Sequence, residues 1–221
     1  MISKIKEAYN QAIFDTDKNA ALRIVHEALQ KGVTPETIVF NVVVPSIEYM
    51  TTSIRQNFGA SLAQHFMTAQ IAAQVTDEML AMFSTPSKII GKLVIGTSQG
   101  DFHGLGKKIV IGCLKAQMIE SVDLGLNVSA EKFVNEAINH QAQVIGISSM
   151  MLHTARGENA CLGVRKILIE KELERKIKII VGGAPYRYDH ELYKSVKADA
   201  WAENGIAAGK VIAQLISEVE P

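Results

Sequence analysis

The first 84 residues place apolar side chains three and four positions apart, the pattern of amphipathic helices. One helix is predicted over residues 18–31, and another begins at Thr34 and Pro35, which supply a capping hydroxyl and a proline for the first turn. Pro45 is expected to end or kink that second helix. The longest pattern covers residues 61–83. Four or five such helices predict a bundle.

The pattern changes after residue 88, where short apolar runs alternate with helical stretches. This alternation predicts an α/β fold with a parallel, doubly wound, five-stranded sheet of the Rossmann-like (flavodoxin-like) kind. We therefore expect an N-terminal helical bundle over residues 1–87 and an α/β domain over residues 88–221, joined by a hinge at Thr85 to Lys88. The expected strands cover residues 92–97, 121–124, 144–148, 177–181 and 198–202, and the expected helices begin at 107 and 129, cover 165–175 and 189–195, and begin again at 206.

Candidate chemistry lies in the loop between the first strand and its helix, where Asp101 precedes His103 by two residues. Ligands of α/β sheets usually bind at this carboxyl edge. A carboxylate can fix one imidazole N–H and leave the other nitrogen to a metal. A lone loop histidine is more often merely solvated, but Gly100, Gly104 and Gly106 permit a flat or bulky ligand to approach the backbone. A phosphate-binding loop is disfavoured, since two lysines follow Gly106 instead of lysine and a hydroxyl residue.

A wider pattern includes this loop. Asp-x-His-x-x-Gly at 101–106 is followed by Ser148-x-Met150 and then by Gly182 and Gly183. The series resembles the cobalamin-binding domain family, whose second element is Ser-x-Leu. Residues 96–110, 122–128 and 181–185 are similar to the corrinoid proteins of methyltransferase systems, and the resemblance covers essentially the whole chain. The stretch between Met150 and Gly182 is longer than is usual in that family.

The resemblance implies a cofactor and a set of contacts. The cofactor is cobalamin, as methylcobalamin and cob(I)alamin, with His103 bound to cobalt in place of the vitamin's own base and Asp101 bonded to the other imidazole nitrogen. Thr154 extends this pair into a hydroxyl relay. The remaining implied contacts are Gly106, Gly182 and Gly183, which leave room for the displaced nucleotide tail, Ser148, which bonds the tail, Met150, which keeps the apolar wall where the family has leucine, and Gly100, Phe102, Gly104 and Leu105 in the loop itself.

The resemblance also implies a methyl-carrying role. The chain would move a methyl group between a substrate-specific methyltransferase and an acceptor methyltransferase, with a reductive activator protein as a further partner. A catalytic methyltransferase barrel commonly needs about 250 residues, more than these 221. A carrier subunit with no catalytic residue of its own is therefore expected, rather than a complete enzyme. The helical part would cover the upper cofactor face, with Phe58, Phe66 and Met67 as candidate contacts.

Other readings remain open from the residues. The same module serves adenosylcobalamin mutases and cobalamin-dependent sensors, and without the resemblance a flavin or nucleotide module would be expected. Lys and Arg together number 23, as do Asp and Glu, so the chain has no net positive charge that would attract nucleic acid.

No apolar run suits a membrane span or a secretory signal, and a cytoplasmic protein is expected. Cys113 and Cys161 fit reduced, buried thiols. His153 lies either at the cofactor's edge or in an exposed loop.

Overall fold

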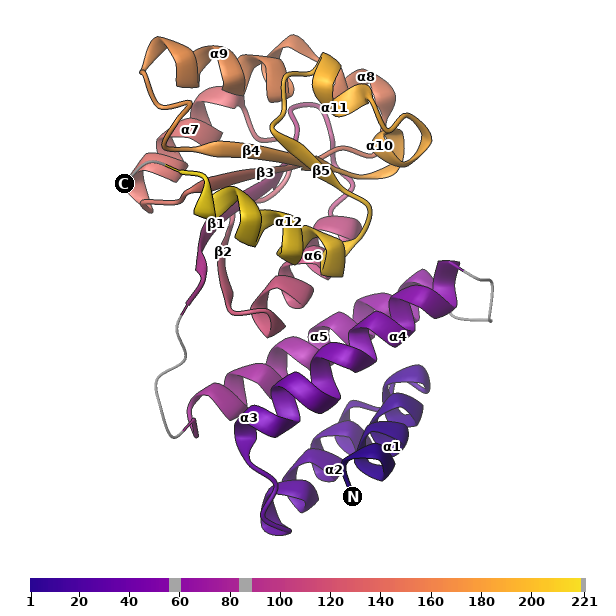
Figure 1. The fold of residues 1–221 in the computed structure, drawn as a ribbon. Helices are drawn as coiled ribbons and strands as arrows, with labels where there is room; N and C mark the ends of the chain where they lie inside the picture. Colours follow the sequence, from indigo (N-terminus) through magenta and orange to yellow (C-terminus); the bar gives the residue numbers. More distant parts are fainter. Residues whose placement is uncertain (56–60, 84–88, 220–221) are drawn as a thin grey trace. The chain divides into compact units, whose positions relative to one another are not determined.

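The computed structural model describes residues 1–55, 61–83 and 89–219. The chain forms two compact units, one of Met1–Lys88 with Lys115–Gln117 and one of Ile89–Leu114 with Met118–Pro221 (Figure 1). The hinge expected at Thr85 to Lys88 and the candidate contact Phe58 lie outside the described residues. No helix in the described part of the chain is both long and apolar enough to cross a membrane.

The first unit is the helical bundle that the apolar spacing predicts. Helix α1 (Ile2–Phe14) packs on α2 (Lys18–Gln30), and α4 (Val44–Arg55) packs on α5 (Leu62–Leu80). Their apolar faces meet in a core that is almost inaccessible to solvent, in which burial of aliphatic side chains supplies the stability. The side chains that form it include Ile13, Val25, Val42, Ile47, Val75 and Met79.

The chain remains helical through Pro45, so the expectation that a helix ends there is wrong. Helix α3 (Pro35–Ile38) runs into a π-helical turn, η1 (Val39–Val43), which continues directly into α4. Proline lacks an N–H and its ring clashes with the carbonyl one turn earlier in an ordinary α-helix. The wider π turn just before Pro45 accommodates both effects without ending the helix.

The second unit contains the predicted five-stranded parallel sheet, which is confirmed. Its strands lie in the order β2-β1-β3-β4-β5, and every pairing is parallel. Strand β2 begins two residues earlier than expected, because Ile119 already pairs with Gly91 at the start of β1. The strands are β1 (Gly91–Thr97), β2 (Ile119–Asp123), β3 (Val144–Ser148), β4 (Lys178–Gly182) and β5 (Ala200–Ala202).

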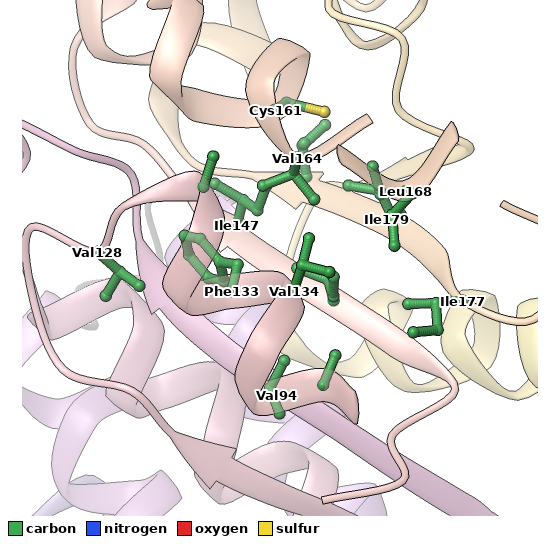
Figure 2. Close-up of a cluster of buried hydrophobic side chains, with 14 of the residues drawn as sticks. Val94, Val128, Phe133, Val134, Ile147, Cys161, Val164, Leu168, Ile177 and Ile179 are labelled. Atoms are coloured by element: carbon green, nitrogen blue, oxygen red, sulfur yellow. The ribbon is translucent and has the colours of Figure 1, made fainter. Parts of the chain in front are cut away.

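Helices cover both faces of this sheet (Figure 1). Helices α6 (Leu105–Ala116) and α12 (Gly205–Ser217) pack on Leu93 and Ile180, whereas α7 (Ala130–Asn139) and α9 (Gly163–Glu170) pack on alternate residues of the same strands. Figure 2 shows this second cluster, in which Val94, Ile147 and Ile179 meet side chains of α7 and α9. Both faces are buried, which explains the unbroken apolar runs 93–95, 144–147 and 179–181 in the three central strands, whereas the edge strand β2 is partly polar.

Short helices follow the strands near the carboxyl edge. Two of the expected helices differ from the structure. The one predicted over 165–175 is α9, which ends at Glu170, and the chain then turns through Glu172 with φ 57°. Of the one predicted over 189–195, only residues 192–195 are helical, and a separate short helix precedes that range. The short helical segments are α8 (Leu152–Ala155), η2 (Glu158–Leu162), α10 (Ala184–Tyr188) and α11 (Leu192–Ser195).

The strand order places a topological switch point between β1 and β3. From β1 the chain passes to β2 on one side, and it then returns to β3 on the other. Sheets of this kind bind ligands at such a switch point, at the carboxyl ends of the two strands. Asp101 and His103 lie in the loop after β1, and Met150 and Thr154 lie in the segment after β3, Thr154 within α8.

Candidate functional site

The loop after β1 presents an imidazole whose orientation is fixed by a buried carboxylate. Asp101 Oδ1 accepts a hydrogen bond from the His103 backbone N–H at 2.9 Å and lies 3.0 Å from His103 Nδ1. An ionised carboxylate can only accept, so Nδ1 carries a hydrogen, and in the neutral ring Nε2 has the lone pair. The Asp101 side chain is fully buried, whereas that of His103 is 57% exposed. The pair thus offers one oriented nitrogen donor to a ligand from outside.

The second oxygen of Asp101 ties this loop to the segment after β3. Its Oδ2 accepts from the Met150 backbone N–H at 2.7 Å and from the Thr154 hydroxyl at 2.8 Å. Burial alone would raise the pKa of Asp101, but the hydrogen bonds from His103, Met150 and Thr154 outweigh it and hold the pKa below its ordinary value. The carboxylate therefore stays ionised at neutral pH, and the expected extension of the His103–Asp101 pair to Thr154 is present.

The backbone around Asp101 is held by two residues to which sequence reasoning assigned no role. The Asp101 carbonyl accepts from Thr97 Oγ1 at 2.6 Å and from the Asn127 N–H at 3.1 Å. Asn127 Oδ1 in turn accepts from the Gly100 N–H at 2.7 Å. Asn127 lies in residues 122–128, a segment whose resemblance to corrinoid proteins was the only sign of its role in the sequence. Its contacts could not be predicted, because they join loops that are distant in sequence.

Large apolar side chains are exposed on the same edge of the sheet. Phe102, in the loop beside His103, is 66% exposed, and the others are also accessible to solvent. Solvated apolar groups gathered on neighbouring loops mark an interaction site. We call this group the apolar collar; it comprises Phe102 and Leu105 after β1, Leu126 after β2, and Met150, Met151 and Leu152 after β3.

The predicted Ser148 and glycine positions lie on adjacent strands. Ser148 pairs with Thr97 on β1 and with Gly182 on β4, so these carboxyl ends are side by side. Gly183 has φ 113°, and a Cβ built there would lie 2.0 Å from the Ser149 carbonyl oxygen. Position 183 therefore requires glycine for a conformational reason, because neither its backbone angle nor the available space admits a side chain.

Two further polar contacts beside the site were missed. The Ser98 and Ser149 hydroxyls lie 2.9 Å apart between the ends of β1 and β3, and both residues are buried. Lys107, in the first turn of α6, is only 2% exposed and pairs with Asp123 at the end of β2. Sequence reasoning used Lys107 only to reject a phosphate-binding loop. His153 lies on α8 and is exposed.

Replacing Asp101 by asparagine is expected to lower the free energy of unfolding by about 2–4 kcal/mol, since an amide group would face donors and each unpaired buried donor costs about 1–3 kcal/mol. The folded pKa of Asp101 is lowered, so its contribution is present above the unfolded pKa of about 4 and is lost as the pH falls through the folded pKa. Denaturant unfolding of the wild type and of Asp101→Asn should show that the difference between their free energies of unfolding becomes smaller as the pH falls. A difference that does not change with pH would contradict the role of the ionised carboxylate.

Comparison with known proteins gives consistent results along the chain. The family described as "B12 binding domain" matches residues 91–209. Trimethylamine corrinoid protein 2 of Methanosarcina mazei is 30% identical over 226 residues, covering 97% of this chain and 96% of that protein. Dimethylamine corrinoid protein 1 of the same organism is 29% identical over 208 residues, covering 93% of each chain.

Solved structures with this fold span both units. A chain of the methanol:cobalamin methyltransferase complex MtaBC from Methanosarcina barkeri superposes with a TM-score of 0.73 at 20% identity, covering 97% of this chain and 80% of that one. A cobalamin-binding protein from Desulfitobacterium hafniense DCB-2 gives a TM-score of 0.71 at 21% identity, covering 95% and 97%. At these identities the structures establish the fold.

Proposed function

The chain belongs to the B12-binding domain family, so its cofactor is cobalamin with its central cobalt, and we propose that it is a corrinoid carrier of a methyltransferase system. In this proposal the vitamin binds with its own base displaced and with His103 as the cobalt ligand, and the protein moves a methyl group between two methyltransferases. A helical cap domain over residues 1–87 and a cobalamin-binding domain over 88–221 make up the carrier. The single observation that carries the proposal is the exposed imidazole of His103, oriented by buried Asp101 at the switch point of the sheet.

The residues at this edge fit cobalamin. His103 supplies one nitrogen donor, which suits a metal that brings its other ligands in a macrocycle, and the Asp101 carboxylate fixes the orientation of the ring that presents it. The apolar collar suits a flat corrin ring. A Cβ built at Gly106 would have no atom within 4 Å, which leaves space beside the loop, and Ser148 offers a hydroxyl at the end of β3 for the nucleotide tail.

When bound, cobalamin supplies a cobalt centre that accepts a methyl group and gives it up again. The protein's contribution lies in His103 Nε2, which can hold either a proton or a metal but not both. Asp101 keeps the hydrogen of the neutral ring on Nδ1 and so presents the Nε2 lone pair. Proton uptake at Nε2 would release the ligand, and the network around Asp101 would hold the ring in place for its return.

The proposed partners are a substrate-specific methyltransferase, an acceptor methyltransferase and a reductive activator protein. The names of the relatives support a substrate-specific methyltransferase as a partner, since these relatives are dimethylamine and trimethylamine corrinoid proteins. The match to the trimethylamine protein covers the helical unit as well as the α/β unit, which favours a carrier over a mutase subunit or a sensor. Affinity capture with the loaded, full-length chain would identify the partner methyltransferase.

The ligand assignment can be tested with protein whose histidines carry the heavy nitrogen isotope. Cobalamin of natural isotopic composition is added, the cobalt is reduced to Co(II), and its paramagnetic resonance is recorded. A histidine ligand changes the nitrogen splitting between labelled and unlabelled protein, whereas the vitamin's own base cannot. We expect the splitting to change with the label; a nitrogen splitting that ignores it would mean that the vitamin keeps its base, and would refute the proposal.

A further inference from the structure

The loop between β2 and α7, residues 123–128, contacts the His103 loop at three successive places. The first contact is at its beginning, where Asp123 pairs with the buried ammonium of Lys107. Asp123 Oδ1 also accepts from the Gly125 N–H at 2.8 Å, so one carboxylate serves both loops. This contact holds the end of the His103 loop that enters α6.

The second contact lies beside His103 itself. A Cβ built at Gly104 would be 2.8 Å from Leu126 Cδ2, closer than real Cβ atoms approach. The Leu126 side chain therefore lies directly against the Gly104 backbone, in the space that any other residue at 104 would fill. This contact brings the β2–α7 loop against the peptide after His103.

The third contact is made by Asn127, whose φ of 52° is a left-handed conformation that asparagine tolerates better than most residues. Its Oδ1 accepts from the Gly100 N–H at 2.7 Å, on the strand side of Asp101. Its own N–H donates to Thr97 Oγ1 at 2.9 Å and to the Asp101 carbonyl at 3.1 Å. One asparagine thus bonds the backbone on both sides of the residue that orients His103.

We propose that residues 123–128 form a clamp that sets the position of His103, and that Asn127 is its central positioning residue. The inference rests on the proposed function, because positioning His103 matters for cofactor binding only if His103 is the cobalt ligand. A ligand equilibrium at His103 depends on how completely the loop is held in the ligating geometry before the metal arrives. Losing the Asn127 side chain removes the acceptor of the Gly100 N–H and weakens that restraint, although the described hydrogen bonds of Asn127 go to neither the ring nor the carboxylate.

The test compares two variants of the full-length chain loaded with cobalamin. Asn127→Gly removes the Oδ1 acceptor and relieves the left-handed backbone, whereas Asn127→Asp keeps an acceptor for the Gly100 N–H. Gln141→Gly is the matched control, since Gln141 has a φ of 53° at an exposed position after α7. The readouts are the ratio of histidine-ligated to unligated Co(II) in the resonance spectrum and the thermal unfolding of the cofactor-free protein.

We expect Asn127→Gly to lower the ligated-to-unligated ratio by about five- to tenfold, the effect of one ordinary hydrogen bond, and Asn127→Asp and Gln141→Gly to keep the wild-type ratio. An unchanged ratio in Asn127→Gly, or an equal loss in Asn127→Asp, overturns the clamp. If Asn127→Gly also lowers the unfolding temperature of the cofactor-free protein, Thr97→Val serves as the second variant. It removes the hydroxyl that donates to the Asp101 carbonyl. If Thr97→Val leaves the ligated-to-unligated ratio unchanged, the clamp is refuted. A wild-type spectrum without a histidine nitrogen would instead refute the proposed function, so the two failures differ.

Discussion

Replacing His103 by alanine is expected to abolish the histidine nitrogen splitting in the Co(II) spectrum of the loaded protein while leaving the fold intact. The side chain is more than half exposed, and its described hydrogen bond is to Asp101. After the substitution Asp101 still accepts from the backbone N–H at 103, from Met150 and from Thr154. The free energy of unfolding should therefore change by no more than about 1 kcal/mol.

The matched control for this variant is His153→Ala. His153 is exposed on α8, one residue before Thr154, and is the other histidine for which the sequence leaves a place at the cofactor's edge open. We expect the control to keep the wild-type spectrum. Loss of the splitting in His153→Ala together with its survival in His103→Ala would transfer the ligand role to His153. Thermal unfolding of both cofactor-free variants verifies that the spectra come from folded protein.

Replacing Gly183 by alanine is expected to destabilise the chain by about 3–5 kcal/mol or to prevent folding, the range reached only by severe steric or backbone strain. Its φ of 113° disfavours any side chain, and the Cβ would meet the Ser149 carbonyl oxygen. That oxygen belongs to the backbone at the end of β3, so it cannot turn away as a flexible side chain would. Denaturant unfolding of the cofactor-free protein, or the yield of folded protein, measures the loss.

Gly106→Ala provides the comparison for this second prediction. Gly106 lies in the first turn of α6, and a Cβ there would have no atom within 4 Å. Alanine favours a helix over glycine by up to about 1 kcal/mol. We therefore expect the cofactor-free Gly106→Ala protein to be as stable as the wild type or more stable. Equal stability of the two alanine variants would show that the backbone approach between β3 and β4 is not as close as described.

The fold was predictable because its signal is local. Parallel strands buried on both faces give short apolar runs such as Val144 to Ser148, and the helices between them keep the period of one covered face. Pro45 was misjudged because the outcome depends on the width of the preceding turn, which the order of residues does not reveal. The early end of α9 likewise depends on a left-handed residue, Glu172, that no proline or glycine announces.

The site was predictable only in part. Asp101 and His103 came from a spaced motif, Thr154 was added as an extension of this pair, and the structure joins the three by hydrogen bonds. Thr97 and Asn127 were missed because they bond backbone atoms of Gly100 and Asp101. Every residue has these backbone atoms, so no residue type in the sequence marks the contact. The close approach of Gly183 to the Ser149 carbonyl was not predictable either, because it depends on the register of β3 and β4.

The shared carboxylate of Asp101 makes the two loops open together. The amides of His103 and Met150 donate to opposite oxygens of one buried group, so neither segment can fray without leaving a buried charge short of donors. Their local stabilities are therefore not separate quantities, and both amides should exchange with solvent hydrogen through a common opening event. We therefore expect the ends of β1 and β3 to open as one cooperative unit.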